Sequence, residues 1–166
     1  MVAGTSGTGK TTLARRLAVE LDLPHVEIDA LFHGPAWQPR PEFIADVEAF
    51  AATDRWVTEW QYPQVRPLLA ARADLVVWLD LPFRTTLRRV VARTVRRRLR
   101  REKLWNGNVE PPLWTFLTDP EHIVRWAIKT RRRLATDVPA LQQSRPGLPI
   151  VRLRTADDVE RWIAQV

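Results

Sequence analysis

An octet of residues close to the amino terminus has the residue types and spacing of a loop that binds nucleoside triphosphates. It fits the pattern GxxxxGK(S/T) at every position and reads Gly4-Thr5-Ser6-Gly7-Thr8-Gly9-Lys10-Thr11. In such loops glycines let backbone N–H groups converge on phosphate oxygens, a lysine reaches the β and γ oxygens, and a threonine hydroxyl ligates Mg²⁺. We therefore expect residues 4–12, Thr12 included, to bind ATP, with Lys10 acting in catalysis and Thr11 on the metal. The alternative is a chance turn rich in glycine and threonine.

The sequence around the octet predicts the junction of strand and helix that such a loop needs. Leu13, Leu17 and Leu21 recur at helical spacing, which predicts a helix over 10–21 with one buried face. The positive end of this helix would strengthen the anion site. Only residues 1–3 precede the loop, whereas a central strand normally has about five residues. We therefore expect a chain extended upstream to melt at a higher temperature.

The rest of the chain alternates short apolar segments with segments of helical periodicity. We expect strands over 25–28, 55–58, 75–79 and 148–153, and helices over 41–50, 85–101, 122–134 and 156–163. Strands separated by helices of about ten residues or more pair in parallel, through right-handed crossovers. The sequence therefore predicts one α/β domain over 1–166 with three layers, whose ligands bind at the carboxyl ends of the strands.

The composition excludes some kinds of site and leaves the meaning of the charge open. The chain has no cysteine, which excludes disulfides and thiolate metal sites. No apolar run approaches the roughly 18 residues of a membrane span, and the phosphate loop stands where a signal peptide would, so we expect a cytoplasmic protein. The net charge of +7 comes mainly from arginine. An excess of arginine is typical of phosphoryl-transfer sites and of surfaces that contact nucleic acid. It can also result from a biased genomic base composition.

Polar and aromatic residues follow several of the expected strands. Asp29, Glu59 and Asp80 each come after an apolar segment, so they would line one edge of the sheet. Asp80 ranks behind the other two, because the residues after it form a simple turn. In the loop after Asp29, His33 and Trp37 are candidates to contact an acceptor, although a loop histidine and a packed tryptophan are the commoner cases.

Four segments carry a resemblance to a known family. They are Ile28-Asp29-Ala30-Leu31-Phe32-His33-Gly34, Glu59-Trp60-Gln61-Tyr62, Trp78-Leu79-Asp80-Leu81-Pro82 and Leu104-Trp105-Asn106-Gly107-Asn108. With the phosphate loop, they resemble P-loop kinases grouped with adenylate kinase, and more narrowly the small bacterial kinase-like proteins called topology modulation proteins. The resemblance spans nearly the whole chain. It implies a five-stranded parallel sheet in the order 2-3-1-4-5 and a mobile, arginine-bearing lid, here over about 84–120.

The resemblance also implies roles for two of the acids. Asp29 would orient or deprotonate the acceptor hydroxyl, and its alternative role is to cap the loop over 29–34. Glu59 would be a Walker-B-type acid that contacts Mg²⁺ through water, and its alternative role is a surface ion pair. Many members of the group have a Gly-Asn-Tyr-like element where this chain has Trp60-Gln61-Tyr62, so the chain departs from the pattern at these acceptor contacts.

Arginines recur at helical spacing along the expected helix over 85–101. The first row comprises Arg89, Arg93, Arg97 and Arg100 or Arg101. These side chains share one helix face, and a γ-phosphate would offset their like charges. Arg89 and Arg93 lie nearest the strand end, so we expect them to be catalytic lid residues that clamp the transferring group. A solvated face is the alternative for the outer arginines. A second row, which offers a further clamp residue on lid closure, comprises Arg125, Lys129 and Arg132.

These observations favour an ATP- and Mg²⁺-dependent kinase that phosphorylates a small-molecule acceptor: a nucleotide, a nucleoside or another hydroxyl metabolite. The second hypothesis is a nucleotide-dependent protein that binds nucleic acid or regulates, with Trp105, Trp114 and Trp126 stacking on bases among the arginines. Those tryptophans otherwise pack within the core or lid. The third is a related fold that binds ATP without turnover.

Overall fold

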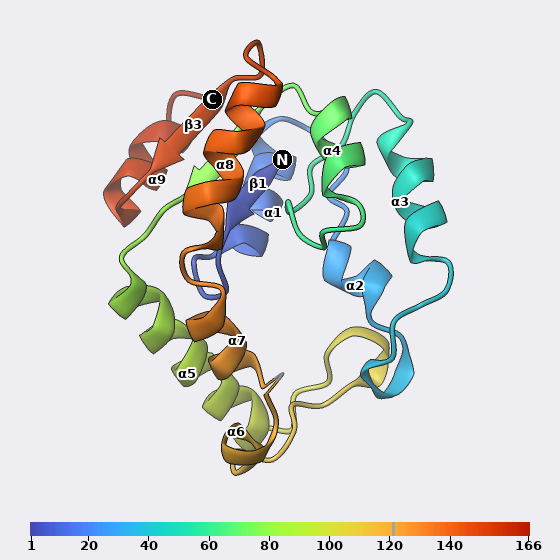
Figure 1. Cartoon of the computed structure of the whole chain (residues 1–166), viewed down its shortest axis with the longest axis vertical. Coiled ribbons are helices and arrows are strands. Elements are labelled where there is room, and N and C mark those ends of the chain that lie inside the picture. Colours follow the sequence, from blue (N-terminus) through green and yellow to red (C-terminus); the bar gives the residue numbers. More distant parts are fainter. Residues whose placement is uncertain (121) are drawn as a thin grey trace.

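Three parallel strands form the centre of the computed structural model, which describes residues 1–120 and 122–166. They are β1 (Val2–Gly4), β2 (Val76–Leu79) and β3 (Ile150–Leu153), hydrogen-bonded in the order β1-β2-β3. All four residues of β2 are buried, as its continuous apolar sequence predicts for a central parallel strand. Helices surround this sheet, and the two chain ends lie on the same side of the molecule (Figure 1).

Two further segments continue the sheet beyond β1, but neither forms a strand. Val2 makes a parallel bridge with Glu59, and Val57 makes another with His25. The expected five-stranded sheet is therefore wrong in detail: among the described residues, a three-stranded sheet is extended by two bridged segments.

The outermost bridged segment is short because the chain on either side of it cannot continue the pairing. Pro24 has no N–H to donate, and helix α2 (Ile28–Phe32) begins almost at once. The backbone N–H of Ile28 donates to the buried carboxylate of Glu59 at 3.3 Å, which satisfies a donor at the start of the helix. The strand expected over 25–28 is thus corrected, and Asp29 lies in the first turn of a helix rather than after a strand.

The remaining helices include the expected ones in the expected order, with further short helices between them. Their bounds are α1 (Lys10–Glu20), η1 (Pro35–Trp37), α3 (Phe43–Ala51), α4 (Arg66–Arg72), α5 (Phe83–Leu99), η2 (Trp105–Gly107), α6 (Thr115–Thr118), α7 (Ile123–Lys129), α8 (Arg133–Ser144) and α9 (Ala156–Ile163). Helix α8 is one of the unexpected elements, because the single helix expected over 122–134 ends at Lys129 and a new one starts at Arg133.

Helix α8 forms although it contains Pro139, which removes a helical hydrogen bond. Its residues Leu134, Val138 and Leu141 lie at helical spacing and are buried. Burying each of these side chains contributes roughly 2 kcal/mol, against about 3 kcal/mol or more lost to an interior proline. Apolar burial therefore outweighs the local cost.

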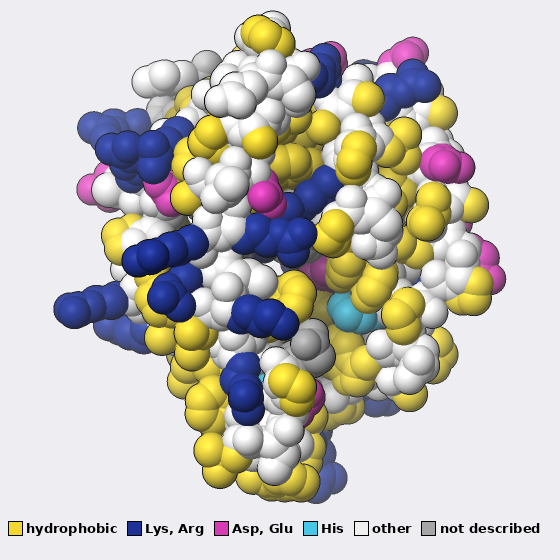
Figure 2. All heavy atoms as spheres, in the orientation of Figure 1, with side chains coloured by type: hydrophobic (Ala, Val, Ile, Leu, Met, Phe, Trp, Pro, Cys, Tyr) yellow, Lys and Arg dark blue, Asp and Glu magenta, His cyan; other side chains and the backbone are white. Residues whose placement is uncertain are grey.

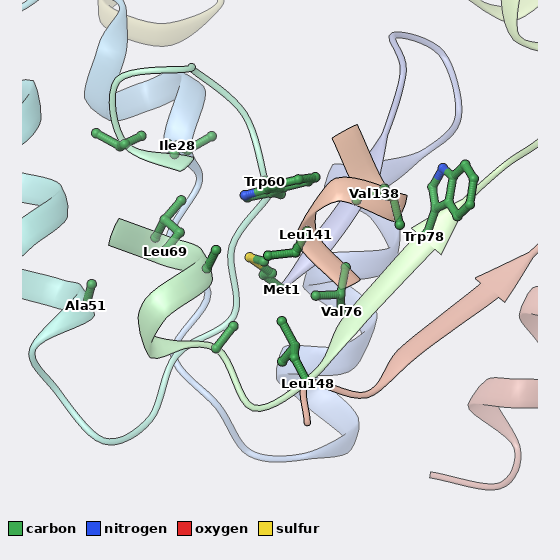
Figure 3. Close-up of a cluster of buried hydrophobic side chains, with 14 of the residues drawn as sticks. Met1, Ile28, Ala51, Trp60, Leu69, Val76, Trp78, Val138, Leu141 and Leu148 are labelled. Atoms are coloured by element: carbon green, nitrogen blue, oxygen red, sulfur yellow. The ribbon is translucent and has the colours of Figure 1, made fainter. Parts of the chain in front are cut away.

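Two apolar cores lie on opposite faces of the sheet and give the domain three layers. Val76 and Trp78 of β2 join the core beneath α3, α4 and α8, whereas Val77 and Leu79 join the core beneath α1 and α9. Figure 3 shows the first core, in which side chains from β2, α4 and α8 gather around Met1. Both faces of the sheet are covered, so the open place for ligands is its carboxyl edge.

Helices α5 and α7 pack against each other beyond this edge (Figure 1). The chain from the end of α5 through η2 then crosses to the loop that follows α2. In the part of the chain that the structure describes, no helix is long and apolar enough to span a bilayer.

Candidate functional site

The loop between β1 and α1 has the backbone geometry of an anion site. Gly7 and Gly9 adopt positive φ angles of 82° and 95°, which favour glycine. Gly9 is the N-cap residue of α1 and has no side chain to cap the helix, and the first turn contains no acidic residue, so the first N–H groups of the helix stay available to a ligand. A Cβ at Gly9 would meet nothing within 4 Å, so this side of the loop is open.

Gly7 is needed for a second reason, because α5 packs directly on it. A Cβ at Gly7 would lie 2.3 Å from the carbonyl oxygen of Thr86 and 2.7 Å from a methyl group of Val90. We expect Gly7→Ala to lower the free energy of unfolding by at least about 2 kcal/mol, through backbone strain and this clash. Denaturant titration measures the change. Gly9→Ala measures the effect of backbone strain without a clash, because Gly9 also has a positive φ but no neighbour at the Cβ position. Gly147→Ala, in open space, is the neutral control. A Gly7→Ala protein as stable as Gly147→Ala would contradict the packing described.

Lys10 lies buried at the base of the loop and brings the two predicted acids together. Its Nζ donates to the carbonyl oxygen of Thr5 at 3.2 Å. Burial lowers the pKa of Lys10, while the charges of Asp29 and Glu59 oppose that shift. The lysine therefore lies near both carboxylates, in the loop that would hold the phosphates.

Glu59 is buried rather than part of a surface ion pair. Burial alone would raise the pKa of Glu59, but the His25 ring at 3.6 Å, the nearby Thr11 hydroxyl and the hydrogen bond from the Ile28 N–H hold that pKa below its usual value. The carboxylate therefore stays ionised beside the Thr11 hydroxyl, the group that the motif assigns to Mg²⁺. No cluster of three or more His, Cys, Asp or Glu side chains suited to a metal occurs among the described residues. The donor set fits a cation held by one hydroxyl, substrate phosphates and water, as Mg²⁺ commonly is.

Asp29 is fixed by two residues that follow Glu59. Its Oδ1 accepts hydrogen bonds from the Tyr62 hydroxyl at 2.6 Å and from Gln61 Nε2 at 3.1 Å. Tyr62 has a φ of 57°, uncommon for this residue type, and its pKa is raised by burial and by Asp29, so it remains a hydrogen-bond donor. Gln61, at which this chain departs from the Gly-Asn-Tyr-like element, and Tyr62, at which it agrees, thus orient the predicted acceptor carboxylate. Both bonds use Oδ1, and no described hydrogen bond uses Oδ2.

His33 continues this cluster from the end of α2. Its Nε2 lies 3.2 Å from the Tyr62 hydroxyl, and its ring stacks on Trp105 with centroids 5.7 Å apart. Burial lowers the pKa of His33, and the charge of Asp29 opposes the shift without cancelling it. At neutral pH the ring is therefore uncharged.

The titration of His33 should report this environment. Because the folded pKa of His33 lies below the ordinary histidine value of 6.5, the stability that neutral His33 contributes is complete above about pH 6.5 and is lost as pH falls through the folded pKa. We expect the His33 ring resonances to titrate with a midpoint below 6.5 in NMR spectra, with His33→Gln identifying them. A midpoint at or above 6.5 would contradict the burial described.

Two short loops pack against each other beside this cluster and are joined by hydrogen bonds. The first spans 33–39 and the second 103–109, each closed by an antiparallel bridge between its ends. Asn108, which is 6% exposed, donates to the carbonyl oxygen of Gly34 at 2.8 Å and accepts from the Trp37 N–H at 3.0 Å. Part of the predicted lid therefore already covers the loop after Asp29.

The predicted lid arginines differ in where they lie. Arg93 is close enough to Lys10 to lower its pKa, and burial, then the charge of Arg97, lowers the pKa of Arg93 itself. The Nε of Arg93 is buried without a hydrogen-bond partner in the described part of the chain. Arg97 contacts Glu110 at 3.6 Å within the lid. Arg89 is exposed, and no described contact brings it to the phosphate loop, so its role stays a prediction.

The other candidates are occupied elsewhere. Asp80 pairs with Arg152, whose guanidinium lies over Trp78. In the second arginine row, Arg125 donates to the carbonyl oxygen of Leu117, and Lys129 lies 5.7 Å from the ring centroid of Trp126. These contacts stabilise the sheet edge and the lid, and they do not join the phosphate loop.

One residue of the site has no local signal in the sequence. Arg66 begins α4, one helical turn after Tyr62, and its charge is close enough to lower the pKa of Lys10. Figure 2 shows Lys and Arg side chains at the centre of the face between α8 and α4, with acidic side chains and a histidine close by. The cations around the phosphate loop therefore come from α1, α4 and α5.

Comparisons with known proteins show the fold. No family model and no curated protein matches the chain. Among solved structures, a gluconokinase from Sinorhizobium meliloti 1021 superposes with a TM-score of 0.52 at 18% identity, over 99% of this chain and 90% of that one. A sugar kinase from Janibacter sp. HTCC2649 gives a TM-score of 0.52 at 19% identity, over 99% and 88%. The chain therefore has the α/β fold of P-loop kinases, while the narrower resemblance to topology modulation proteins stays a prediction.

Proposed function

We propose that this protein is an ATP- and Mg²⁺-dependent kinase that transfers the γ-phosphoryl group to a hydroxyl of a small molecule. The observation that carries the proposal is the convergence of Lys10, Asp29 and Arg93 beside an open phosphate loop. Phosphoryl transfer needs mainly positioning and neutralisation of charge. A cation at the loop, a second cation from the lid side and a carboxylate for the nucleophile meet that need.

The phosphate loop and its lysine would hold the triphosphate. The N–H groups of the loop and the start of α1 bind the phosphate oxygens, and Lys10 neutralises charge on the β and γ groups. Thr11 would ligate Mg²⁺, with Glu59 holding a water of its shell; the ion supplies further neutralisation of charge on the phosphates. Arg93, with its unpartnered Nε, faces the same charge from α5.

Asp29 would act on the acceptor. Oδ1 is held by Tyr62 and Gln61, which leaves Oδ2 to accept a hydrogen bond from the acceptor hydroxyl. The hydroxyl oxygen forms a bond to the γ-phosphorus, the bond from that phosphorus to the β–γ bridging oxygen breaks, and the hydroxyl proton passes to Asp29. The products are a phosphate ester and ADP.

The arginines on α5 favour this function over nucleic-acid binding. Arg93 is close enough to Lys10 to lower its pKa, and Arg97 contacts Glu110 at 3.6 Å and lies 5.9 Å from the ring centroid of Trp105. A helix face that binds a nucleic-acid backbone would instead leave these side chains free along the surface. Convergence on the phosphate loop is what a phosphoryl-transfer site requires.

An acceptor screen with γ-labelled ATP and Mg²⁺ tests the proposal. The panel should hold nucleotides, nucleosides, sugars and sugar acids; the last two come first because a gluconokinase and a sugar kinase share the fold. We expect label to appear in an acceptor. ATP binding without any labelled acceptor, joined by nucleic-acid binding that weakens steeply with salt, would contradict it.

A further inference from the structure

Two arginines share one carboxylate between α4 and α8. Arg66 pairs with Asp137 through NH1, and the Nε of Arg133 lies 3.3 Å from the same carboxylate oxygen of Asp137. The cluster therefore contains two guanidinium charges and one carboxylate charge. Its net positive charge lies beside a site that already contains Lys10 and Arg93.

Arg66 keeps a free binding edge in spite of that pair. The guanidinium contacts Asp137 only through NH1, and Nε is buried without any hydrogen-bond partner among the described residues. No described bond uses NH2 either. Nε and NH2 form the edge of a guanidinium that binds a carboxylate or phosphate through two parallel hydrogen bonds. The side chain is 16% exposed, and buried polar groups without partners are rare enough to need an explanation.

The rest of the side chain is fixed in place. Its guanidinium lies 4.8 Å from the ring centroid of Trp60, and the indole of Trp60 donates to the carbonyl oxygen of Arg66 at 3.2 Å. Burial lowers the pKa of Arg66, and Asp137 opposes that shift. A buried cation that is positioned from two sides is arranged to receive an anion with little loss of conformational freedom.

The cluster lies at the acceptor end of the site. The backbone N–H of Arg66 donates to the carbonyl oxygen of Tyr62 at 3.2 Å, and the Tyr62 hydroxyl holds Asp29. The same short segment thus connects the free arginine edge to the carboxylate proposed to take the acceptor proton. A molecule whose hydroxyl reaches Asp29 would extend toward Arg66.

We infer that Arg66, with Arg133 behind it, binds an anionic group of the phosphoryl acceptor, so that the substrates are hydroxy acids or phosphorylated hydroxyl compounds rather than neutral alcohols. This inference rests on the proposed kinase function for the identity of the site. Asp137 holds Arg66 by NH1 and leaves the second edge for the ligand. Carboxylate and phosphate satisfy this edge alike, so both sources of the anion are tested.

The experiment compares matched anionic and neutral compounds by calorimetry, with ADP and Mg²⁺ present to fill the phosphate loop. The carboxylate arm uses D-gluconate and D-sorbitol, and the phosphate arm uses glycerol 3-phosphate and glycerol. We expect the anion to bind at least about 10-fold more tightly than its neutral partner in one arm. Arg66→Gln should lower the binding affinity for that anion by about 10- to 100-fold, because a pair of charged hydrogen bonds is lost. The affinity for the neutral compound should stay unchanged.

Arg145 supplies the control for a purely structural role of Arg66. It joins α8 to α4 at their other ends, where its NH1 donates to the carbonyl oxygen of Ala73 at 3.1 Å and also to that of Ala70. Arg145→Gln should leave the binding of both compounds unchanged. Equal binding of anion and neutral compound in both arms, or equal losses in the two variants, would overturn the inference.

Measuring product in the same samples, with ATP in place of ADP, separates this inference from the proposed function. If an anion binds through Arg66 but is never phosphorylated, the result would support the anion site and contradict the proposed kinase function. If the neutral compounds are phosphorylated with no dependence on Arg66, the result would support the kinase function and contradict the anion site.

Discussion

Lys10→Ala is expected to lower kcat/KM for phosphoryl transfer by at least about 1000-fold, because the phosphates lose a buried cation placed against them. Removal of the lysine also leaves Asp29 and Glu59 without the positive charge that lies near both of them. Those carboxylates would then repel the triphosphate. Initial rates of ADP release in the presence of acceptor measure the effect.

The matched control for Lys10 is Lys129→Ala. Lys129 is an exposed lysine at the end of α7 that lies over Trp126, remote from the phosphate loop in its contacts. We expect its rates to stay within about 2-fold of the unaltered protein, as is usual for surface substitutions. A folded Lys10→Ala protein that retained a tenth or more of the activity would show that the loop does not bind the reacting triphosphate.

Asp29→Asn should lower kcat by about 100- to 10,000-fold while leaving the affinity for MgATP nearly unchanged. Asparagine keeps an Oδ1 acceptor for Tyr62 and Gln61, so the local hydrogen bonds persist. It lacks the negative charge and the basic oxygen that the acceptor hydroxyl needs. Steady-state kinetics with both substrates varied separates the effect on kcat from the effect on KM.

A structural role of Asp29 predicts a different pattern. If the carboxylate served only to hold Tyr62 and the loop after α2, Asp29→Asn would change stability or acceptor affinity and leave kcat nearly intact. Asp22→Asn is the control, because Asp22 is a fully exposed acid whose contact with Arg55 lies at 3.7 Å. Equal kcat values for Asp29→Asn and Asp22→Asn would remove Asp29 from the mechanism.

Local sequence predicted the elements whose signals are local. The closing helix has the expected bounds, Ala156–Ile163, and its Thr155 cap forms reciprocal hydrogen bonds with Asp158. The helix after the phosphate loop also starts at the expected Lys10. Turn chemistry, helix caps and apolar spacing lie within a few residues of one another, so the chain alone is sufficient to predict them.

Contacts distant in sequence decided what local signals could not. Ile28 begins a helix because the carboxylate of Glu59, from another segment, accepts its N–H, whereas the apolar residues before it favour a strand. Arg66 was not predicted because its partner Asp137 lies 71 residues away. Pro139 disfavours a helix by its local effect on the backbone, but the burial of Leu141 and its neighbours stabilises the helix in the folded protein.

In the candidate site, too, the sequence predicted the features with local signals but not those that depend on contacts distant in sequence. The phosphate loop could be read from its motif, and Asp29 and Glu59 from their places after apolar segments, although α2 positions Asp29 rather than a strand. The resemblance marked the segment 104–108, but its docking on the loop over 33–39 depends on Asn108 contacts that join residues over 70 positions apart. Lid contacts of this kind have no local pattern in sequence.

Phosphoryl transfer from ATP to an acceptor is best tested by following the phosphorus atoms themselves. ³¹P NMR of a mixture of the protein, Mg²⁺, ATP and the acceptor panel resolves the γ-phosphate of ATP, inorganic phosphate and phosphate esters. We predict an ester resonance that grows as the γ-phosphate resonance declines, and that is absent with Lys10→Ala. A spectrum in which ATP is unchanged, or in which the γ-phosphate becomes only inorganic phosphate, would contradict phosphoryl transfer to an acceptor by this protein.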